Sequence, residues 1–324
     1  MMFKSIFKDE LEIYLASYNN MAYYTKMHIK EVLNSFDKWL IDIKLTSKFI
    51  SQETVNGWVN KISKGISSQT LYDKVCMLNK FLNSLKLLRF NVNMAYVGKY
   101  SSFHNTYTPY IFSDKELKDI LIYIDSLPSN TKKNSKEIIY SPLIIRILAY
   151  CGTRIGETIS IRINDIEFEK GFITLRETKN NKERIVVVHP KLLEMISKYI
   201  KYLKLENNDF LFPGVKPNTH FSIPSIRRSF DRALLAVGIQ KNTRADHSRG
   251  PCLHCLRHYF VLMAFKQGVA NGISVESQIP YLSYYLGHSS LNETEKYMKF
   301  SSELFPEEMG KFDDYSMDIF PEDI

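Results

Sequence analysis

Hydrophobic positions at helical spacing dominate the first hundred residues of the chain. Residues 8–44 contain two stretches in which apolar side chains recur every three or four positions. Two further stretches follow Ser51 and Ser67 or Ser68, and a serine hydroxyl can accept hydrogen bonds from unpaired N–H groups at the start of a helix. The pattern predicts a helical domain over residues 1–105.

A second domain is predicted after a break in this pattern. Residues 98–109 show no periodicity and are typical of a linker. Ser113 and Glu116 then form the Ser-x-x-Glu pattern of a capping box, which favours the start of a helix. Pro142 begins an almost wholly apolar segment that ends at Cys151, so we expect a helix there, buried at the domain centre.

The rest of the second domain is predicted to be helical, apart from one small sheet. Residues 172–176 and 184–189 are rich in β-forming side chains on either side of Asn180 and Asn181, so we expect a hairpin. Further helices are expected at about residues 190–204, 223–237, 253–267, 277–287 and 291–299. The expected fold class is mainly α, with a mixed α+β domain over residues 106–302 that holds a small antiparallel sheet.

Composition favours a globular protein of the cytoplasm. The 324 residues, of which 44% are apolar and 24% charged, are enough for two domains. Asp9 and Glu10 follow the N-terminus too closely for a signal peptide, and no apolar run approaches the ~20 residues that span a bilayer. The four cysteines are too few for a secreted disulfide framework, so we expect reduced thiols at Cys76, Cys151, Cys252 and Cys255.

The net charge of +8 is unevenly distributed. Residues 303–324 contain eight acids and one base, and the preceding 302 residues therefore have a charge of +15. A basic body of this size suits nucleic acid, because each phosphate that it neutralises releases counterions. A merely solubilising surface charge would explain the total equally well.

Two basic positions in the second domain are candidates for phosphate chemistry. Arg154 follows a Cys-Gly-Thr turn, where a fixed guanidinium can reach a phosphate, although an arginine after a turn is usually a surface residue. Lys179 lies at the expected hairpin tip, and its flexible stem suits protonation of a departing oxygen. Lys182 and Arg184 are nearby alternatives, and a solvated basic turn is the simpler interpretation.

Two histidines, an arginine and a tyrosine complete the candidates. His254 and Arg257 stand three positions apart, which places a titratable donor and a cation on one helical face. His288 follows a glycine expected to end a helix, and Tyr297 comes nine residues later, so both side chains can line one pocket. Taken singly, most of the 20 tyrosines are expected to be packing residues.

The order of these residues resembles the tyrosine recombinase, or lambda-type integrase, family. The resemblance covers nearly the whole chain. It is carried by five motifs that occur in the family's order: Cys-Gly-Thr-Arg-Ile-Gly-Glu, Thr-Lys-Asn-Asn-Lys-Glu-Arg, His-Cys-Leu-Arg-His, Leu-Gly-His-Ser-Ser and Glu-Lys-Tyr. The resemblance implies an N-terminal helical, SAM-like core-binding domain and a C-terminal catalytic domain that together clamp double-stranded DNA. It also implies four protomers on two duplexes, and residence on the bacterial nucleoid when bound.

The resemblance implies a role for six residues and requires no metal or cofactor. Tyr297 is the nucleophile that forms a 3′-phosphotyrosyl bond and leaves a 5′-hydroxyl. The other five assist as cations or proton-transfer groups: Arg154, Lys179, His254, Arg257 and His288.

Some features depart from the common family pattern. Thr153 and Cys255 stand where leucine and aspartate are frequent, but neither replaces a catalytic atom. The 31-residue interval from Arg257 to His288 looks like the transposon-encoded branch of integrases, which moves or resolves mobile elements. The separate arm-site-binding domain of many phage integrases is expected to be absent.

Several alternatives stay open at this point. A zinc site at Cys252, His254, Cys255 and His258, with or without His247, is cramped and lacks a second pair at a typical interval. A type IB topoisomerase would use similar chemistry on one duplex, and a non-catalytic regulator would bind a DNA site without cutting it. The acidic tail, residues 303–324, is either a frayed terminus or an inter-protomer contact through Phe305, Met309, Phe312, Ile319 and Phe320.

Overall fold

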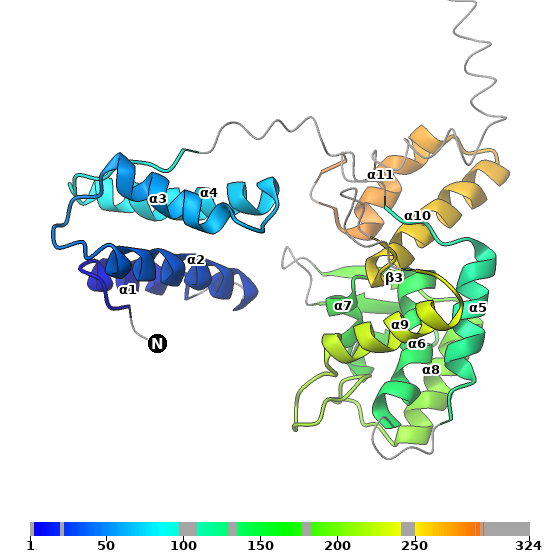
Figure 1. Cartoon of the computed structure of the whole chain (residues 1–324). Helices are drawn as coiled ribbons and strands as arrows, with labels where there is room; N and C mark the ends of the chain where they lie inside the picture. Colours follow the sequence, from blue (N-terminus) through cyan, green and yellow to red (C-terminus); the bar gives the residue numbers. More distant parts are fainter. Residues whose placement is uncertain are drawn as a thin grey trace, which may run out of the picture. The chain divides into compact units, whose positions relative to one another are not determined.

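The chain forms two compact units, which are described separately. The computed structural model describes residues 3–19, 23–96, 109–128, 135–176, 183–240 and 250–288, together with 290, 291 and 294. The first unit spans Met1–Asn105 and the second spans Thr106–Ile324 (Figure 1). Within the described residues, no helix combines the length and the apolar character needed to cross a membrane.

The first unit is a group of helices around one hydrophobic core. Its described helices are α1 (Lys8–Ala16), α2 (Tyr23–Asp42), α3 (Gln52–Ser63) and α4 (Ser68–Leu87). The hydroxyl of Ser51 accepts a hydrogen bond from the N–H of Thr54, and Ser67 caps α4 in the same way. Phe36 and Trp58 meet edge to face in the core, with ring centroids 5.8 Å apart. The predicted helices and caps are therefore confirmed, with Ser67 rather than Ser68 as the second cap.

The second unit is built around helix α6 (Ser135–Cys151). This helix packs against α5, α7, α8, α9 and α10, and its inward side chains, among them Ile144 and Ile147, are fully buried. The other described helices are α5 (Asp114–Asp125), α7 (Ile155–Ile159), α8 (Pro190–Leu203), α9 (Ile223–Ala236), α10 (Leu253–Ala270) and α11 (Val275–Leu286). Ser113 and Glu116 form the predicted capping box of α5.

The predicted start of the central helix at Pro142 is wrong. Helix α6 begins seven residues earlier, at Ser135, and Pro142 lies inside it. Proline removes a backbone donor from the helix interior and so disfavours helix there. Burial of Tyr140 on the preceding turn, together with the hydrogen bond from the Ser141 hydroxyl to the Glu137 carbonyl, stabilises the extra residues.

A small antiparallel sheet lies beside these helices. Its strands β1 (Ile166–Glu167), β2 (Phe172–Leu175) and β3 (Arg184–Val187) pair in the order β1-β2-β3. The register sets Phe172 opposite Val187 and Leu175 opposite Arg184. The predicted hairpin and the predicted fold class are confirmed, whereas two-residue β1 was too short to predict. The turn at Asn180-Asn181 and most of the predicted helix 291–299 lie outside the described residues.

We expect substitution of Ile147 by alanine to destabilise the second unit more than the same change at Ile122. Ile147 is fully buried on α6, whereas 56% of Ile122 on α5 is exposed. Loss of a buried isoleucine costs about 2–5 kcal/mol, whereas a surface change usually stays within about 0.5 kcal/mol. Urea unfolding measures both, and equal losses would contradict the central place of α6.

Candidate active site

Arg154 is held at the start of α7 by a sharp turn. Gly152 adopts a left-handed backbone with φ +64°, and a Cβ built there would lie 2.4 Å from Cδ1 of Phe260, so only glycine fits. Two residues later the N–H of Arg154 donates to Oε2 of Glu157 at 2.7 Å. The turn and this bond fix the backbone from which the Arg154 side chain extends.

The Glu157 carboxylate is shared by two arginines. Nη1 of Arg154 donates to Oε1 at 2.9 Å, while Nη1 and Nη2 of Arg184 donate to Oε1 and Oε2, each at 2.7 Å. Burial alone would raise the pKa of Glu157, but the hydrogen bonds and charge of Arg184, and then those of Arg154, hold that pKa below its usual range. Glu157 therefore stays ionised in the interior.

Three arginines meet at the C-terminal end of α11. Nε of Arg184 donates to the Tyr285 carbonyl at 3.0 Å, and Nη2 of Arg257 donates to the Leu286 carbonyl at 2.8 Å. Nη2 of Arg154 donates to the next carbonyl, that of Gly287, at 3.3 Å. Cations are favourable at this end of a helix because the last carbonyls lack intrahelical partners and concentrate negative charge.

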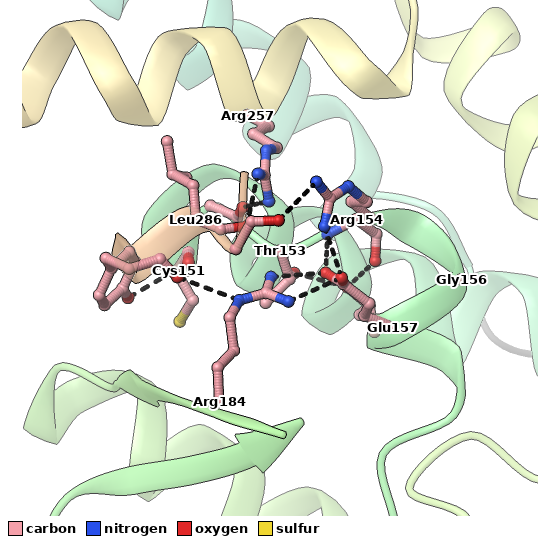
Figure 2. A network of polar contacts seen from close by, with 12 residues as sticks. Cys151, Thr153, Arg154, Gly156, Glu157, Arg184, Arg257 and Leu286 are labelled. Atoms are coloured by element: carbon pink, nitrogen blue, oxygen red, sulfur yellow. Dashed lines mark hydrogen bonds and ion pairs between the residues drawn. The ribbon is translucent and has the colours of Figure 1, made fainter. Parts of the chain in front are cut away.

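The same contacts link distant segments of the second unit (Figure 2). Arg257 extends from α10 and Arg184 from β3 toward Leu286, and Arg154, the N-cap residue of α7, lies beside Glu157 of that helix. Nη1 of Arg257 also donates to the Gly152 carbonyl at 2.8 Å. Only 1% of Arg257 is exposed, so α10, α11 and the Gly152 turn are joined through a buried cation.

His288 follows directly from this turn. Gly287 ends α11 in the left-handed conformation, with φ +64°, and the His288 N–H donates to the Ser283 carbonyl at 3.0 Å. Nδ1 of His288 lies 2.7 Å from Oγ1 of Thr294, which is fully buried. The backbone turn and the threonine together fix the place of this imidazole.

Two more histidines lie on α10 beside Arg257. The rings of His254 and His258 are edge to face, with centroids 4.8 Å apart. Burial, and then the charges of His254, Arg257 and His288, lower the pKa of His258 to about 3. His258 is therefore neutral at physiological pH.

The described part of the chain brings together four of the six predicted site residues. Arg154, Arg257 and the turn before His288 are bonded to common partners, and His254 and His288 both lie close enough to His258 to influence its charge. Lys179 and Tyr297 lie outside the described residues. The chemical roles of all six stay predictions.

The structure describes some of the residues considered in place of Lys179 or as zinc ligands. Lys182 and His247 lie outside the described residues. The guanidinium of Arg184 binds Glu157 and Tyr285. It does not act as an acid, since arginine stays protonated. Sγ of Cys252 and Cys255 are 3.5 Å apart. Among the described residues, no three His, Cys, Asp or Glu side chains are placed to hold a metal ion.

Comparison with known proteins shows the family of this chain. The family model described as "Phage integrase family" matches residues 112–303. The chain belongs to the phage integrase family. A tyrosine recombinase of Pseudothermotoga lettingae is 24% identical over 291 residues, which cover 88% of this chain and 90% of that protein. A putative integrase/recombinase of Sinorhizobium fredii is 25% identical over 210 residues, which cover 63% of this chain and 66%, just under two thirds, of that protein.

Solved structures of similar fold include two other integrase-family proteins. The XerH site-specific recombinase bound to difH substrate has a TM-score of 0.66 at 19% identity, with 90% of this chain and 81% of that chain covered. The Tn1549 transposon integrase in complex with transposon right end DNA has a TM-score of 0.62 at 16% identity, with 89% and 93% covered. The predicted resemblance to tyrosine recombinases is therefore confirmed for family and fold.

Sequence reasoning missed two residues of this cluster and considered a third for a different role. Glu157 and Thr294 were not among the candidates, and Arg184 was considered only as a substitute for Lys179. Glu157 stands three residues after Arg154 at a helix start, which is the spacing of a capping box and could have identified it. The partners of Arg184 lie 27 and 101 residues away, so no local pattern reveals them.

The low pKa of His258 predicts a loss of stability in acid. The folded-state pKa of about 3 lies below the value of about 6.5 expected when unfolded, so between these pH values the unfolded chain binds more protons. Lowering the pH from 7 to 4.5 should therefore cost about 3 kcal/mol through this group alone. Urea unfolding of wild type and His258→Gln at both pH values isolates the contribution, because Glu157 and the other acids are common to both proteins. Equal losses in the two proteins would refute it.

Proposed function

We propose that this integrase-family protein is a site-specific recombinase that cuts and rejoins double-stranded DNA through a covalent bond to Tyr297. The observation that supports this most is the cluster of Arg154, Arg184 and Arg257 around the turn that leads to His288. With Glu157 as the one carboxylate in these contacts, the cluster keeps two positive charges. Such fixed charge suits the negative charge that builds on a phosphate during displacement.

The arginines have different exposures, which suit different tasks. The side chain of Arg154 is 23% exposed, so it can approach a non-bridging phosphate oxygen. Arg257 is buried against two backbone carbonyls and adds its charge from a fixed position. His288 would then donate a hydrogen bond to the same phosphate from the turn that both arginines hold.

The remaining steps are assigned to residues with suitable chemistry. The Tyr297 oxygen attacks the scissile phosphorus, the bond to the 5′-oxygen breaks, and a 3′-phosphotyrosyl bond forms. Lys179 gives a proton to the departing 5′-oxygen, and His254 accepts the proton of the tyrosine. Attack by a 5′-hydroxyl of a partner duplex reverses these events, and because the phosphodiester energy is kept, no nucleotide cofactor is consumed.

The biological setting we propose is the movement or resolution of a mobile element, by a cytoplasmic protein that resides on the nucleoid when bound to DNA. The DNA-bound XerH and Tn1549 complexes support a duplex partner. The interval from Arg257 to His288 consists of most of α10 and all of α11. The length of this interval resembles that of transposon-encoded members of the family. A mobile-element boundary beside the gene would support this setting.

Replacement of Tyr297 by phenylalanine should abolish covalent attachment to DNA. On a nicked suicide duplex that contains the native site, the wild type is expected to accumulate a protein–DNA adduct resistant to denaturing gel electrophoresis, because the short cleaved strand diffuses away. The variant keeps the ring but lacks the nucleophilic oxygen. Tyr202→Phe, which alters an exposed tyrosine on α8, is the matched control and should cleave like wild type.

Other outcomes of this experiment would identify another function. An adduct with Tyr297→Phe would move the nucleophile elsewhere. Site-specific binding without any adduct would indicate a non-catalytic regulator. Relaxation of supercoiled DNA without sequence preference would indicate a type IB topoisomerase.

We further propose that the protein assembles as four protomers on two duplexes, with the acidic tail of one protomer bound to the next. An open apolar groove of about 590 Å³ in the second unit supports this, since its lining includes Tyr150, Val187, Phe260 and Tyr281. Val187 and Tyr281 are 67% and 78% exposed, although both are apolar or aromatic. The tail, residues 303–324, supplies phenylalanines spaced among acids, so a second copy of this segment is the occupant.

Deletion of residues 303–324 should weaken synapsis of two sites more than binding to one. The deletion removes only an inter-protomer contact, so the affinity of a protomer for its site should change less than about threefold. Mobility-shift assays with one and two duplexes separate the two quantities. Val187→Asp, which places a charge in the groove, should reproduce the deletion, and an equal loss of both kinds of binding would count against the idea.

A further inference from the structure

The Arg184 side chain has no assigned role in the reaction, although it donates three hydrogen bonds within the site. We propose that Arg184 is a positioning residue for DNA cleavage, which holds Glu157 and the end of α11 in one geometry so that Arg154 and His288 face the phosphate. The proposal rests on the proposed function and deepens it. The Arg184 side chain is 8% exposed, so it acts through its neighbours rather than on DNA.

Arg184 neutralises the charge of the Glu157 carboxylate. Glu157 is 5% exposed and lies 2.9 Å from Nη1 of Arg154, so a carboxylate with that one partner would cancel the charge that Arg154 offers to a phosphate. Arg184 binds both carboxylate oxygens at 2.7 Å, whereas the Arg154 guanidinium binds one. Arg184 therefore neutralises Glu157 and leaves the charge of Arg154 available.

Arg184 also fixes the geometry of the turn at the end of α11. The same guanidinium donates through Nε to the Tyr285 carbonyl, two residues before the left-handed Gly287. A Cβ at Gly287 would lie 3.2 Å from Cδ of Arg184, so the turn packs directly on the arginine stem. Because a planar guanidinium offers several donors at fixed angles, one side chain fixes α7 and α11 together, which the single ammonium of lysine cannot reproduce.

The chain offers a matched control in the same hairpin. Arg176, just after β2, also pairs with carboxylates, through Nε to Asp165 at 2.6 Å and Nη1 to Glu183 at 3.1 Å. Its side chain is 55% exposed, and its two carboxylate partners lie on neither α7 nor α11. A change at Arg176 thus removes two hairpin ion pairs and leaves the contacts of Arg184 with Glu157 and Tyr285 in place.

The test compares Arg184→Lys, Arg184→Met and the controls Arg176→Lys and Arg176→Met in the full-length chain. Affinity for the site is measured by mobility shift, and the first-order cleavage rate is measured on the suicide duplex at saturating protein. We expect affinity to change by less than about threefold in all four. Cleavage should fall on the order of 10²-fold in Arg184→Met, since a misplaced catalytic group can cost that much. It should fall on the order of 10-fold in Arg184→Lys, while the controls cleave like wild type.

A double variant distinguishes positioning from loss of structure. In Arg184→Met the buried charge of Glu157 competes for Arg154, and adding Glu157→Gln removes that charge. The double variant should therefore cleave about tenfold faster than Arg184→Met alone, whereas two purely structural defects would add. Normal cleavage by a folded Arg184→Met, or a double variant slower than the single one, would overturn the proposal.

Amide hydrogen exchange at the end of α11 supplies a readout that does not depend on cleavage. The N–H groups of Gly287 and His288 donate to the carbonyls of Tyr284 and Ser283. Their exchange should accelerate at least about tenfold in Arg184→Met and stay unchanged in Arg176→Met. If the wild type formed no adduct, the proposed function would fail by itself, and unchanged exchange in Arg184→Met would separately overturn the positioning role.

Discussion

The ionised Glu157 carboxylate is the interaction on which the rest of the site depends. Three guanidinium groups converge on the end of α11, and like charges at such distances repel one another in a poorly solvated interior. Glu157 and three successive backbone carbonyls provide the opposing negative charge. Without them the positive charges of Arg154, Arg184 and Arg257 would have no opposing charge in these contacts.

This polar cluster depends in turn on the apolar core. Helix α6 is buried along most of its length, and its last residue leads directly into Gly152. The Gly152 carbonyl accepts from Arg257, and the next turn presents Arg154, so the position of both cations follows from the packing of one helix. Since packed interiors deform little, small changes in the core are transmitted to the site.

Contacts between residues close together in the sequence could be predicted, whereas contacts between residues far apart in the sequence could not. Ser51, Ser67 and Ser113 predict helix starts because each hydroxyl accepts a hydrogen bond from a residue three positions later. The β-forming side chains of residues 172–176 and 184–189 predict the hairpin. The helix start predicted at Pro142 was wrong because the packing of Tyr140 outweighs the low preference of proline for a helix interior. Ordered motifs identified Arg154, His254, Arg257 and His288, but the role of Arg184 depends on partners 27 and 101 residues away. Such partners become visible only when the strands and helices are assembled.

Several groups of the site keep one protonation state. The arginines stay charged, Glu157 stays ionised through its two partners, and the low pKa of His258 keeps that buried ring neutral beside Arg257. The charges of the three arginines, Glu157 and His258 are therefore constant over the physiological range of pH. The residues that we propose for proton transfer, Lys179, His254 and Tyr297, are not among these groups. In the proposed reaction, cleavage and rejoining take place at one phosphate, and a charge that does not vary with pH would act on that phosphate in the same way in both steps.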